Sequence, residues 1–333
     1  MDIASHAVAS FALARGFFPR RRWPVVLGIL VAGTLADVDL VSALFGPATY
    51  FAARRTFTHS LLGTLLVIAI ATLFTRYLGK QQIEPLPALI PPLAIAATLH
   101  LLLDLFQSEG VALLWSIRPT RFALDWLPNV DPWILAILIA GILVPELFHL
   151  VSSEIGAKDN SPSGRDGAIL AFALIVLYVG GRAILHSDSL ALLEPHSYRG
   201  ESARRVGAFP DALSIFTWHG VVETQSLVCL VGVPVGPGKS FDPESADCLH
   251  KPEVSPELDA AQKTDIAQKY LQAMPLPRAA VARTQDGYEV VIRSMRDTAE
   301  RETRHRVAAR ILLDSRFGIT VEDLVWLSDI HLR

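Results

Sequence analysis

The sequence predicts a membrane-embedded bundle of five or six α-helices, followed by a small soluble α+β domain. Hydrophobic residues make up 51% of the 333 residues, and the mean hydropathy is +0.37. Residues 1–186 contain 13 Lys/Arg and 12 Asp/Glu, whereas residues 187–333 contain 17 and 21. The first part therefore has the low charge density of a transmembrane domain and the second that of a soluble domain. The net charge of −3 and the lack of a long basic run indicate no nucleic-acid partner.

Six apolar segments account for the predicted spans. The first, residues 3–18, is barely long enough to cross a bilayer and is followed by three arginines, which is why we expect five or six spans. Thr58 is a good N-cap for the third segment. The remaining segments cover residues 23–45, 58–78, 88–106, 132–151 and 167–185.

The last 147 residues alternate apolar and polar side chains with the period of β-strands. Residues 214–235 predict two strands or one long bent strand, with Gly220 near the break, and residues 255–273 predict a helix. Asp286-Gly287 is a strong hairpin signal between strands at 279–283 and 288–294. A second hairpin is expected between residues 306–313 and 319–327.

Ionisable side chains occupy positions in the membrane half where a span would otherwise be purely apolar. His100 and Asp104 lie four residues apart, so they share one helix face. Asp37 and Asp39 fit a helix end, where the chain can turn both carboxylates inward. Charged groups at membrane depth are costly and are kept mainly where they pair, bind ions or take part in chemistry. His and carboxylate are ligands of Zn²⁺ and other divalent metals. The candidate ligands are His6, Asp37, Asp39, His59, His100 and Asp104.

Following the chain through the predicted spans brings all six candidate ligands to one side of the membrane. His6 lies near the start of the first span, the two aspartates near the end of the second, His59 at the start of the third, and the HxxxD pair near the end of the fourth. Successive spans run in opposite directions, so these positions coincide. The sequence therefore predicts a metal site at one membrane surface.

The distribution of Lys and Arg assigns the two sides, because cytoplasmic loops carry an excess of these residues. The side of the predicted site carries five, Arg54, Arg55, Arg118, Arg121 and Arg182. We therefore expect the site and residues 187–333 to lie outside the cytoplasm. The opposite side carries eight: Arg15, Arg20, Arg21, Arg22, Arg76, Lys80, Lys158 and Arg165.

Five short motifs occur in an order and spacing that resemble a known family. They are SHAVAS around His6, LADVD at 35–39, RRTFTHSLLG at 54–63, HLLLD at 100–104 and GVALLW at 110–115. Over residues 1–127 the chain is similar to the YdjM-like inner-membrane metal-dependent hydrolases of bacteria. Ala36 stands where the family has a proline, and Arg54, Arg55 and Thr56 stand where a family-like HRG would add a histidine.

The resemblance implies a metal-dependent hydrolase of the bacterial inner (plasma) membrane whose ligands are the six residues named above. Such ligands can hold one or two divalent ions, Zn²⁺ first and Mn²⁺ or Mg²⁺ as alternatives, and so activate a water molecule. A carboxylate that does not bind the metal, Asp39 or Asp104, can act as the general base.

A site at the membrane surface favours a membrane lipid or lipid-linked substrate. Arg54 and Arg55 match the geometry of a phosphate group, so they are candidate substrate-binding residues for a phosphoester, and they suit anchors for lipid headgroups equally well. The alternative is a non-enzymatic protein, either a metal-ion transporter or a scaffold with a structural metal and an extracytoplasmic binding domain. A transporter would need ligands near the bilayer midplane rather than at one end of the helices.

Cys229 and Cys248 are the two cysteines of the chain. A disulfide between them is permitted if the C-terminal domain lies outside the cytoplasm. A buried thiol and an exposed thiol fit the sequence equally well.

Overall fold

A computed structural model of the chain describes residues 2–80, 84–115, 117–118, 120–154, 164–236, 238–274, 276–296 and 306–329. The chain forms two compact units, and each is described here by itself. The second unit takes in two short segments that the sequence analysis grouped with the membrane half. The first unit consists of Met1–Asp39, Arg55–Ser116 and Phe122–Ala183, and the second of Leu40–Arg54, Ile117–Arg121 and Ile184–Arg333.

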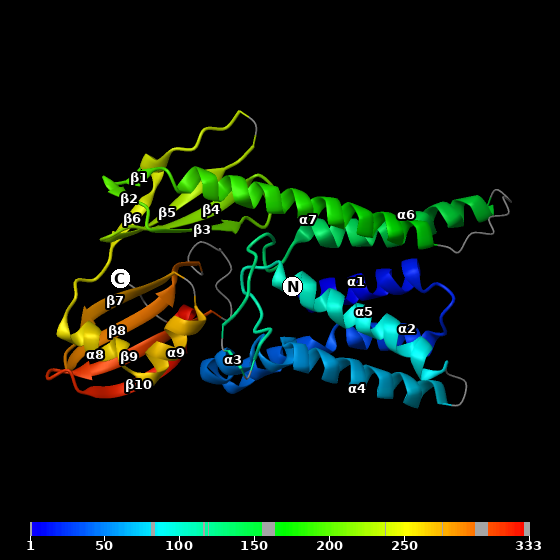
Figure 1. Cartoon of the computed structure of the whole chain (residues 1–333), viewed down its shortest axis with the longest axis horizontal. Helices are drawn as coiled ribbons and strands as arrows, with labels where there is room; N and C mark the ends of the chain where they lie inside the picture. The colour runs from blue at the N-terminus through cyan, green and yellow to red at the C-terminus, as the bar shows by residue number, and fades with distance from the viewer. Residues whose placement is uncertain are drawn as a thin grey trace. The chain divides into compact units, whose positions relative to one another are not determined.

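The first unit is a bundle of antiparallel helices (Figure 1). Among the described residues, four helices are long and apolar enough to cross a membrane: α4 (Leu61–Gly79), α5 (Leu86–Leu105), α6 (Pro132–Glu154) and α7 (Arg165–Leu193). A fifth span results if α2 (Trp23–Ala32) and the 3₁₀ segment Leu35–Phe45, which meet at a bend of 48°, are taken as one. The chain is therefore a multi-pass membrane protein with four or five candidate spans, rather than firmly five or six.

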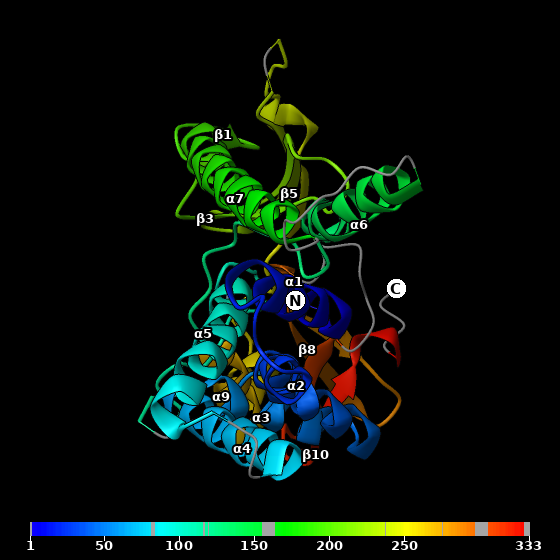
Figure 2. The same cartoon turned by 90° about the vertical axis from the view of Figure 1, so that its right-hand side faces the viewer.

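Helix α1 (Ile3–Phe17) is an interior helix, which explains its short apolar segment. Its 15 residues extend for about 22 Å, less than the roughly 30 Å of a bilayer core. Figure 2, which looks along the helices, shows α1 between α2 and α5 on one side and α6 and α7 on the other. Ala9 and Ala12 pack in one core cluster with residues of α5, α6 and α7, and Leu13 and Ala14 pack in a second cluster with residues of α2, α4 and α5.

The third span begins three residues later than expected. Ser60, not Thr58, is the N-cap of α4, and its hydroxyl oxygen accepts a hydrogen bond from the Gly63 amide at 3.0 Å. The prediction of a Thr58 cap is wrong because residues 57–59 form a separate 3₁₀ turn before α4. This turn leaves the Thr58 side chain available to contact the residues of the site described below.

The second unit contains two four-stranded antiparallel sheets. The first has the order β3-β4-β5-β6, with β3 (Arg205–Pro210), β4 (Thr217–Glu223), β5 (Leu227–Pro234) and β6 (Asp247–His250). The second has the order β10-β9-β8-β7, with β7 (Pro277–Arg283), β8 (Gly287–Ser294), β9 (Val307–Asp314) and β10 (Ile319–Trp326). A short hairpin, β1 (Ser197–Tyr198) and β2 (Glu201–Ser202), precedes them.

Helices α8 (Pro256–Gln262) and α9 (Asp265–Ala273) cover one face of the second sheet (Figure 1). The helix expected over 255–273 is thus two helices, because the first ends at Gln262 with Lys263 as its C-cap, and Thr264 caps the second by accepting a hydrogen bond from the Ala267 amide. Both predicted hairpins are present, β7-β8 and β9-β10. Helix α3 (Pro47–Ala53) belongs to the same unit, where Tyr50 stacks near Trp326 and Phe51 on Tyr270.

The predicted strand region at 214–235 is two strands, but the break is not at Gly220. The turn lies at Thr224–Ser226, and Gly220 pairs with Val231 in the middle of β4. A side chain at this position would collide with Leu193, so the glycine allows close packing rather than a bend. Cys229 and Cys248 face each other on β5 and β6 and form a disulfide.

The helix contact between α1 and the end of α2 depends on Gly33. A Cβ atom built on Gly33 would overlap the hydroxyl of the buried Ser10 of α1. The same glycine supplies the carbonyl oxygen that accepts a hydrogen bond from the His100 ring.

We predict that Gly33→Ala lowers the free energy of unfolding by about 1–3 kcal/mol, because overpacking forces the two helices apart. Gly181→Ala in α7 is the matched control, since its Cβ meets nothing within 4 Å. Thermal unfolding of the detergent-solubilised variants measures both. Equal melting temperatures for Gly33→Ala and the control would contradict this account of the packing.

Candidate metal centre

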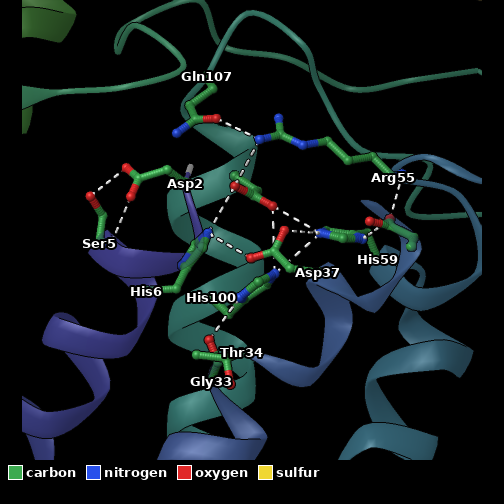
Figure 3. Close-up of polar contacts among 12 residues, drawn as sticks. Asp2, Ser5, His6, Gly33, Thr34, Asp37, Arg55, His59, His100 and Gln107 are labelled. Atoms are coloured by element: carbon green, nitrogen blue, oxygen red, sulfur yellow. Dashed lines mark hydrogen bonds and ion pairs between the residues drawn. The ribbon is translucent and has the colours of Figure 1, made fainter. Parts of the chain in front are cut away.

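Four parts of the first unit bring His and Asp side chains to one end of the helix bundle. His6 lies in the second turn of α1, Asp37 in the 3₁₀ segment after α2, His59 in the turn before α4, and His100 near the end of α5. Figure 3 shows these four side chains pointing toward one another. Together with Asp104 they are between 0 and 2% exposed. The convergence expected from alternating helix directions is therefore present.

Asp104 is the residue that most of the others contact. Its carboxylate lies 3.2 Å from Nε2 of His6, 2.9 Å from Nε2 of His59 and 3.5 Å from Nε2 of His100. The spacing of His100 and Asp104 on one face of α5 permits the last contact, as the sequence predicts. Asp37 lies slightly farther out, with its oxygens 3.9 Å from Nε2 of His6 and from Nε2 of His59.

Backbone and side-chain contacts on the far side of each ring orient the histidines. Nδ1 of His100 lies 2.9 Å from the carbonyl oxygen of Gly33 and donates to it, which leaves the Nε2 lone pair facing the cluster. Nδ1 of His59 lies 3.1 Å from Asp39 and 3.0 Å from the Thr58 hydroxyl. Contacts of this kind are typical of the outer shell of a metal site, where they fix the tautomer of each ligand.

Arg55 contacts both Asp39 and Asp104. Its backbone amide donates to Asp39 at 2.8 Å, while its guanidinium donates to Asp104 at 3.1 Å and to Gln107 at 2.7 Å and lies 3.3 Å from Glu109. Its backbone has φ of +52°, a left-handed conformation that is uncommon for any residue but glycine. Such a conformation persists only where the surroundings impose it, and it is concentrated at functional sites.

The geometry of the cluster fits a divalent metal ion. Ligand atoms of His6, Asp37, His100 and Asp104 all lie within 4.8 Å of one another. Nε2 of His59 is also close, 3.1 Å from Nε2 of His100. Ligand atoms about 2.1 Å from a tetrahedral Zn²⁺ lie roughly 3.4 Å apart, which is within the range of contacts seen here. The donor set of imidazole nitrogens and carboxylate oxygens suits Zn²⁺ and related ions.

The charges of the buried groups lead to the same conclusion. Asp37, Asp39 and Asp104 are all buried; Asp104 accepts a hydrogen bond from the Arg55 guanidinium, and Asp39 accepts one from the Arg55 backbone amide. Buried carboxylates are costly unless positive charge and hydrogen bonds compensate them. A divalent cation would place further positive charge beside these three carboxylates. The described residues can therefore hold a metal ion.

The predicted site residues occupy different places in this arrangement. Asp39 contacts Nδ1 of His59 rather than the Nε2 side of the cluster, and its assignment as a ligand or base stays a prediction. Arg54 is buried and lies in the second compact unit, and its backbone carbonyl accepts a hydrogen bond from Arg121. Lys158, which contributed to the predicted orientation, lies outside the described residues.

Gln107 and Glu109 were missed by the sequence analysis. Both contact the Arg55 guanidinium, which in turn contacts Asp104. The sequence offers one indication of these two residues. They belong to the polar run Gln107–Glu109, which directly follows the apolar residues of α5 where a predicted span ends. Polar residues are common at span ends, so the run alone does not distinguish a role in the site.

We predict that the purified protein carries a stoichiometric divalent metal and that His100→Ala reduces it to less than about a tenth, because the ring donates one of the clustered nitrogens. Elemental analysis of detergent-purified protein measures the content. His149→Ala in α6, a membrane-half histidine outside the cluster, should retain the metal. Near-zero metal in both the wild type and His100→Ala would show that the cluster is not a metal site.

A known protein family matches the part of the chain that carries the cluster. The family model described as "YdjM inner membrane protein" matches residues 1–188, more than half of the chain and all of the candidate ligands. YfhP of Bacillus subtilis (strain 168), described as an uncharacterized protein, is 28% identical over 154 residues, or 43% of this chain and 46% of that relative. The chain thus matches about half the length of this curated relative. No solved structure matches the chain. The protein belongs to the YdjM inner membrane protein family.

Proposed function

We propose that this protein is a metal-dependent hydrolase that acts on a lipid or lipid-linked substrate, with a phosphoester as the preferred bond. The observation that carries the proposal is the convergence of three histidine Nε2 atoms on Asp104, next to Asp37, in a fully buried cluster. The position at the helix ends argues against a transporter, whose ligands would lie near the midplane.

His6, Asp37, His100 and Asp104 would hold the ion, since their ligand atoms are mutually closest. Zn²⁺ is our first choice, and Mn²⁺ or Mg²⁺ would suit a site with more carboxylate contacts. A bound divalent ion supplies positive charge that acidifies water and polarises the oxygen of the scissile ester. Asp104 keeps its orientation through Arg55, which donates to Oδ1 while His59 contacts Oδ2.

His59 would accept the proton of the attacking water at Nε2. Its Nδ1 is held by Asp39, which accepts hydrogen bonds from the Arg55 amide and the Thr58 hydroxyl as well. A carboxylate on Nδ1 fixes the tautomer and stabilises the protonated ring, and so raises the basicity of Nε2. Asp39 would then be a positioning residue that acts through His59, rather than the base itself.

A lipid substrate is supported by the position of the cluster among helices that are long and apolar enough to cross a membrane. A small pocket borders His100 and is lined by side chains of α2, α4 and α5 and the segments before them. Apart from His100, its polar members are Thr58 and Thr64, and its volume of about 10 Å³ suits one water molecule beside the candidate ligands rather than an acyl chain. The apolar lining consists of Ala32, Ala36, Val67, Ala97 and Leu101.

The C-terminal domain would lie outside the cytoplasm. The Lys/Arg distribution favours this orientation, and the disulfide between Cys229 and Cys248 suits an oxidising compartment. The cysteine pairing and the charge distribution are independent of each other, which strengthens the proposal.

We predict that His59→Gln lowers hydrolysis at least about 100-fold and Asp39→Asn about 10- to 100-fold, with the metal retained in both, because the first removes the base and the second its orientation. The assay presents phospholipids and lipid-linked phosphates in mixed micelles with Zn²⁺ or Mn²⁺. His149→Ala is the control for general damage to the bundle. If a substrate is cleaved and both variants cleave it at the wild-type rate, the cluster is not the catalytic site.

We also predict that a reporter active only in the cytoplasm stays silent when fused after the last residue. The same membranes, treated with a thiol-reactive probe without reduction, should leave Cys229 and Cys248 unlabelled because both are in the disulfide. A variant with Cys229→Ser, which frees Cys248, is the positive control for labelling. A strong cytoplasmic reporter signal would reverse the orientation.

A further inference from the structure

Two arginines lie directly opposite each other on the second sheet, far in sequence from the metal centre. Arg278 of β7 is the register partner of Arg293 of β8. Opposite residues on adjacent strands have Cβ atoms about 5 Å apart, so the two guanidinium groups share one region of the sheet face. Ala279 and Ile292, the neighbours of these residues, pack in the core with α8 and α9. Strand alternation therefore places both arginines on the face away from those helices.

The described residues provide no carboxylate that pairs with either arginine. Both side chains are partly buried, and Nε of Arg278 is buried with no hydrogen-bond partner among the described residues. Burial, followed by the charge of Arg278, lowers the pKa of Arg293 below its ordinary value. This pair is therefore destabilising as it stands, because like charges directly opposite each other repel and their partial burial removes water.

Another arginine on the same face of the sheet is paired with a carboxylate, as partly buried arginines usually are. Arg310 of β9 is the register partner of Asp323 of β10 and donates to it through both Nε and Nη2, at 3.1 and 2.6 Å. The hydrogen bonds to Asp323, with the charges of Asp323 and Glu289, raise the pKa of Arg310. Asp323 and Glu289 thus act on Arg310, whereas the Arg278–Arg293 pair has no such carboxylate in the part of the chain that the structure describes.

We propose that Arg278 and Arg293 form a binding site for a phosphate-bearing group. Two guanidinium groups offer paired N–H donors in the geometry that phosphate oxygens accept. A phosphomonoester carries about −1.5 to −2 charges near pH 7, enough to neutralise both arginines, whereas one carboxylate would neutralise only one. The phosphate group can belong to a free anion or to a lipid headgroup, and the site recognises the chemistry that they share.

The test uses the full-length protein in detergent, treated with EDTA so that phosphate does not bind through a metal ion. Inorganic phosphate is titrated at constant ionic strength, and its affinity is measured by calorimetry. We expect Arg278→Gln and Arg293→Gln each to weaken binding about tenfold or more, since each removes charge-assisted hydrogen bonds. Arg310→Gln, on the same face but paired with Asp323, is the matched control and should bind as the wild type does. Arg293→Lys keeps the charge without the paired donors and should give an intermediate affinity.

Thermal unfolding provides a second reading that does not depend on calorimetry. Without phosphate, Arg293→Gln should melt at or above the wild-type temperature, because the repulsion is gone, which also shows that the variant folds. Phosphate should raise the melting temperature of the wild type and of Arg310→Gln but not that of Arg293→Gln.

A third arm distinguishes the source of the phosphate. The wild type and Arg293→Gln are placed in phosphatidylcholine nanodiscs with and without phosphatidic acid. Stabilisation of the wild type alone by phosphatidic acid, without an effect of inorganic phosphate, would support the site with a lipid headgroup as its ligand. The proposal is overturned if neither probe stabilises the wild type, or if both arginine variants bind like Arg310→Gln. None of these outcomes depends on the metal centre.

Discussion

Asp104 is fully buried in a bundle of apolar helices, and the contacts that compensate its charge organise the first unit. Three histidine rings and the Arg55 guanidinium approach its two oxygens from different segments of the chain. An unpaired carboxylate at this depth would cost several kcal/mol, so each of these segments must end at the same point. The short interior helix α1, the bend after α2 and the left-handed backbone at Arg55 all serve this requirement.

The groups that form the site are arranged in an inner and an outer layer with different roles. The inner layer is made of the imidazole Nε2 atoms and the carboxylates of Asp37 and Asp104, which suit a divalent ion. The outer layer consists of the Gly33 carbonyl, Asp39 and Thr58, which contact the ring nitrogens on the other side. Because the outer contacts decide which nitrogen carries the proton, they would set both the affinity for a metal ion and the basicity of the rings in the proposed site.

The chain passes between the two compact units inside the site region. Asp39 ends one segment of the first unit and Arg55 begins the next, and the residues between them belong to the second unit. Within that unit α3 packs on β10 and α9, where Tyr50 lies near Trp326 and Phe51 on Tyr270. The chain segment between two residues of the candidate metal centre thus belongs to the same compact unit as the C-terminal strands.

The sequence by itself determined four of the apolar spans, the two C-terminal hairpins and the HxxxD pair of His100 and Asp104, because each rests on a local period or spacing. The common side for all six candidate ligands also followed, since it needs only the alternation of helix directions. Tertiary structure alone decided that Asp39 supports His59, that Arg55 holds Asp104, and that Arg278 faces Arg293. These relations depend on register and on side-chain approach between distant segments, and no local period specifies either.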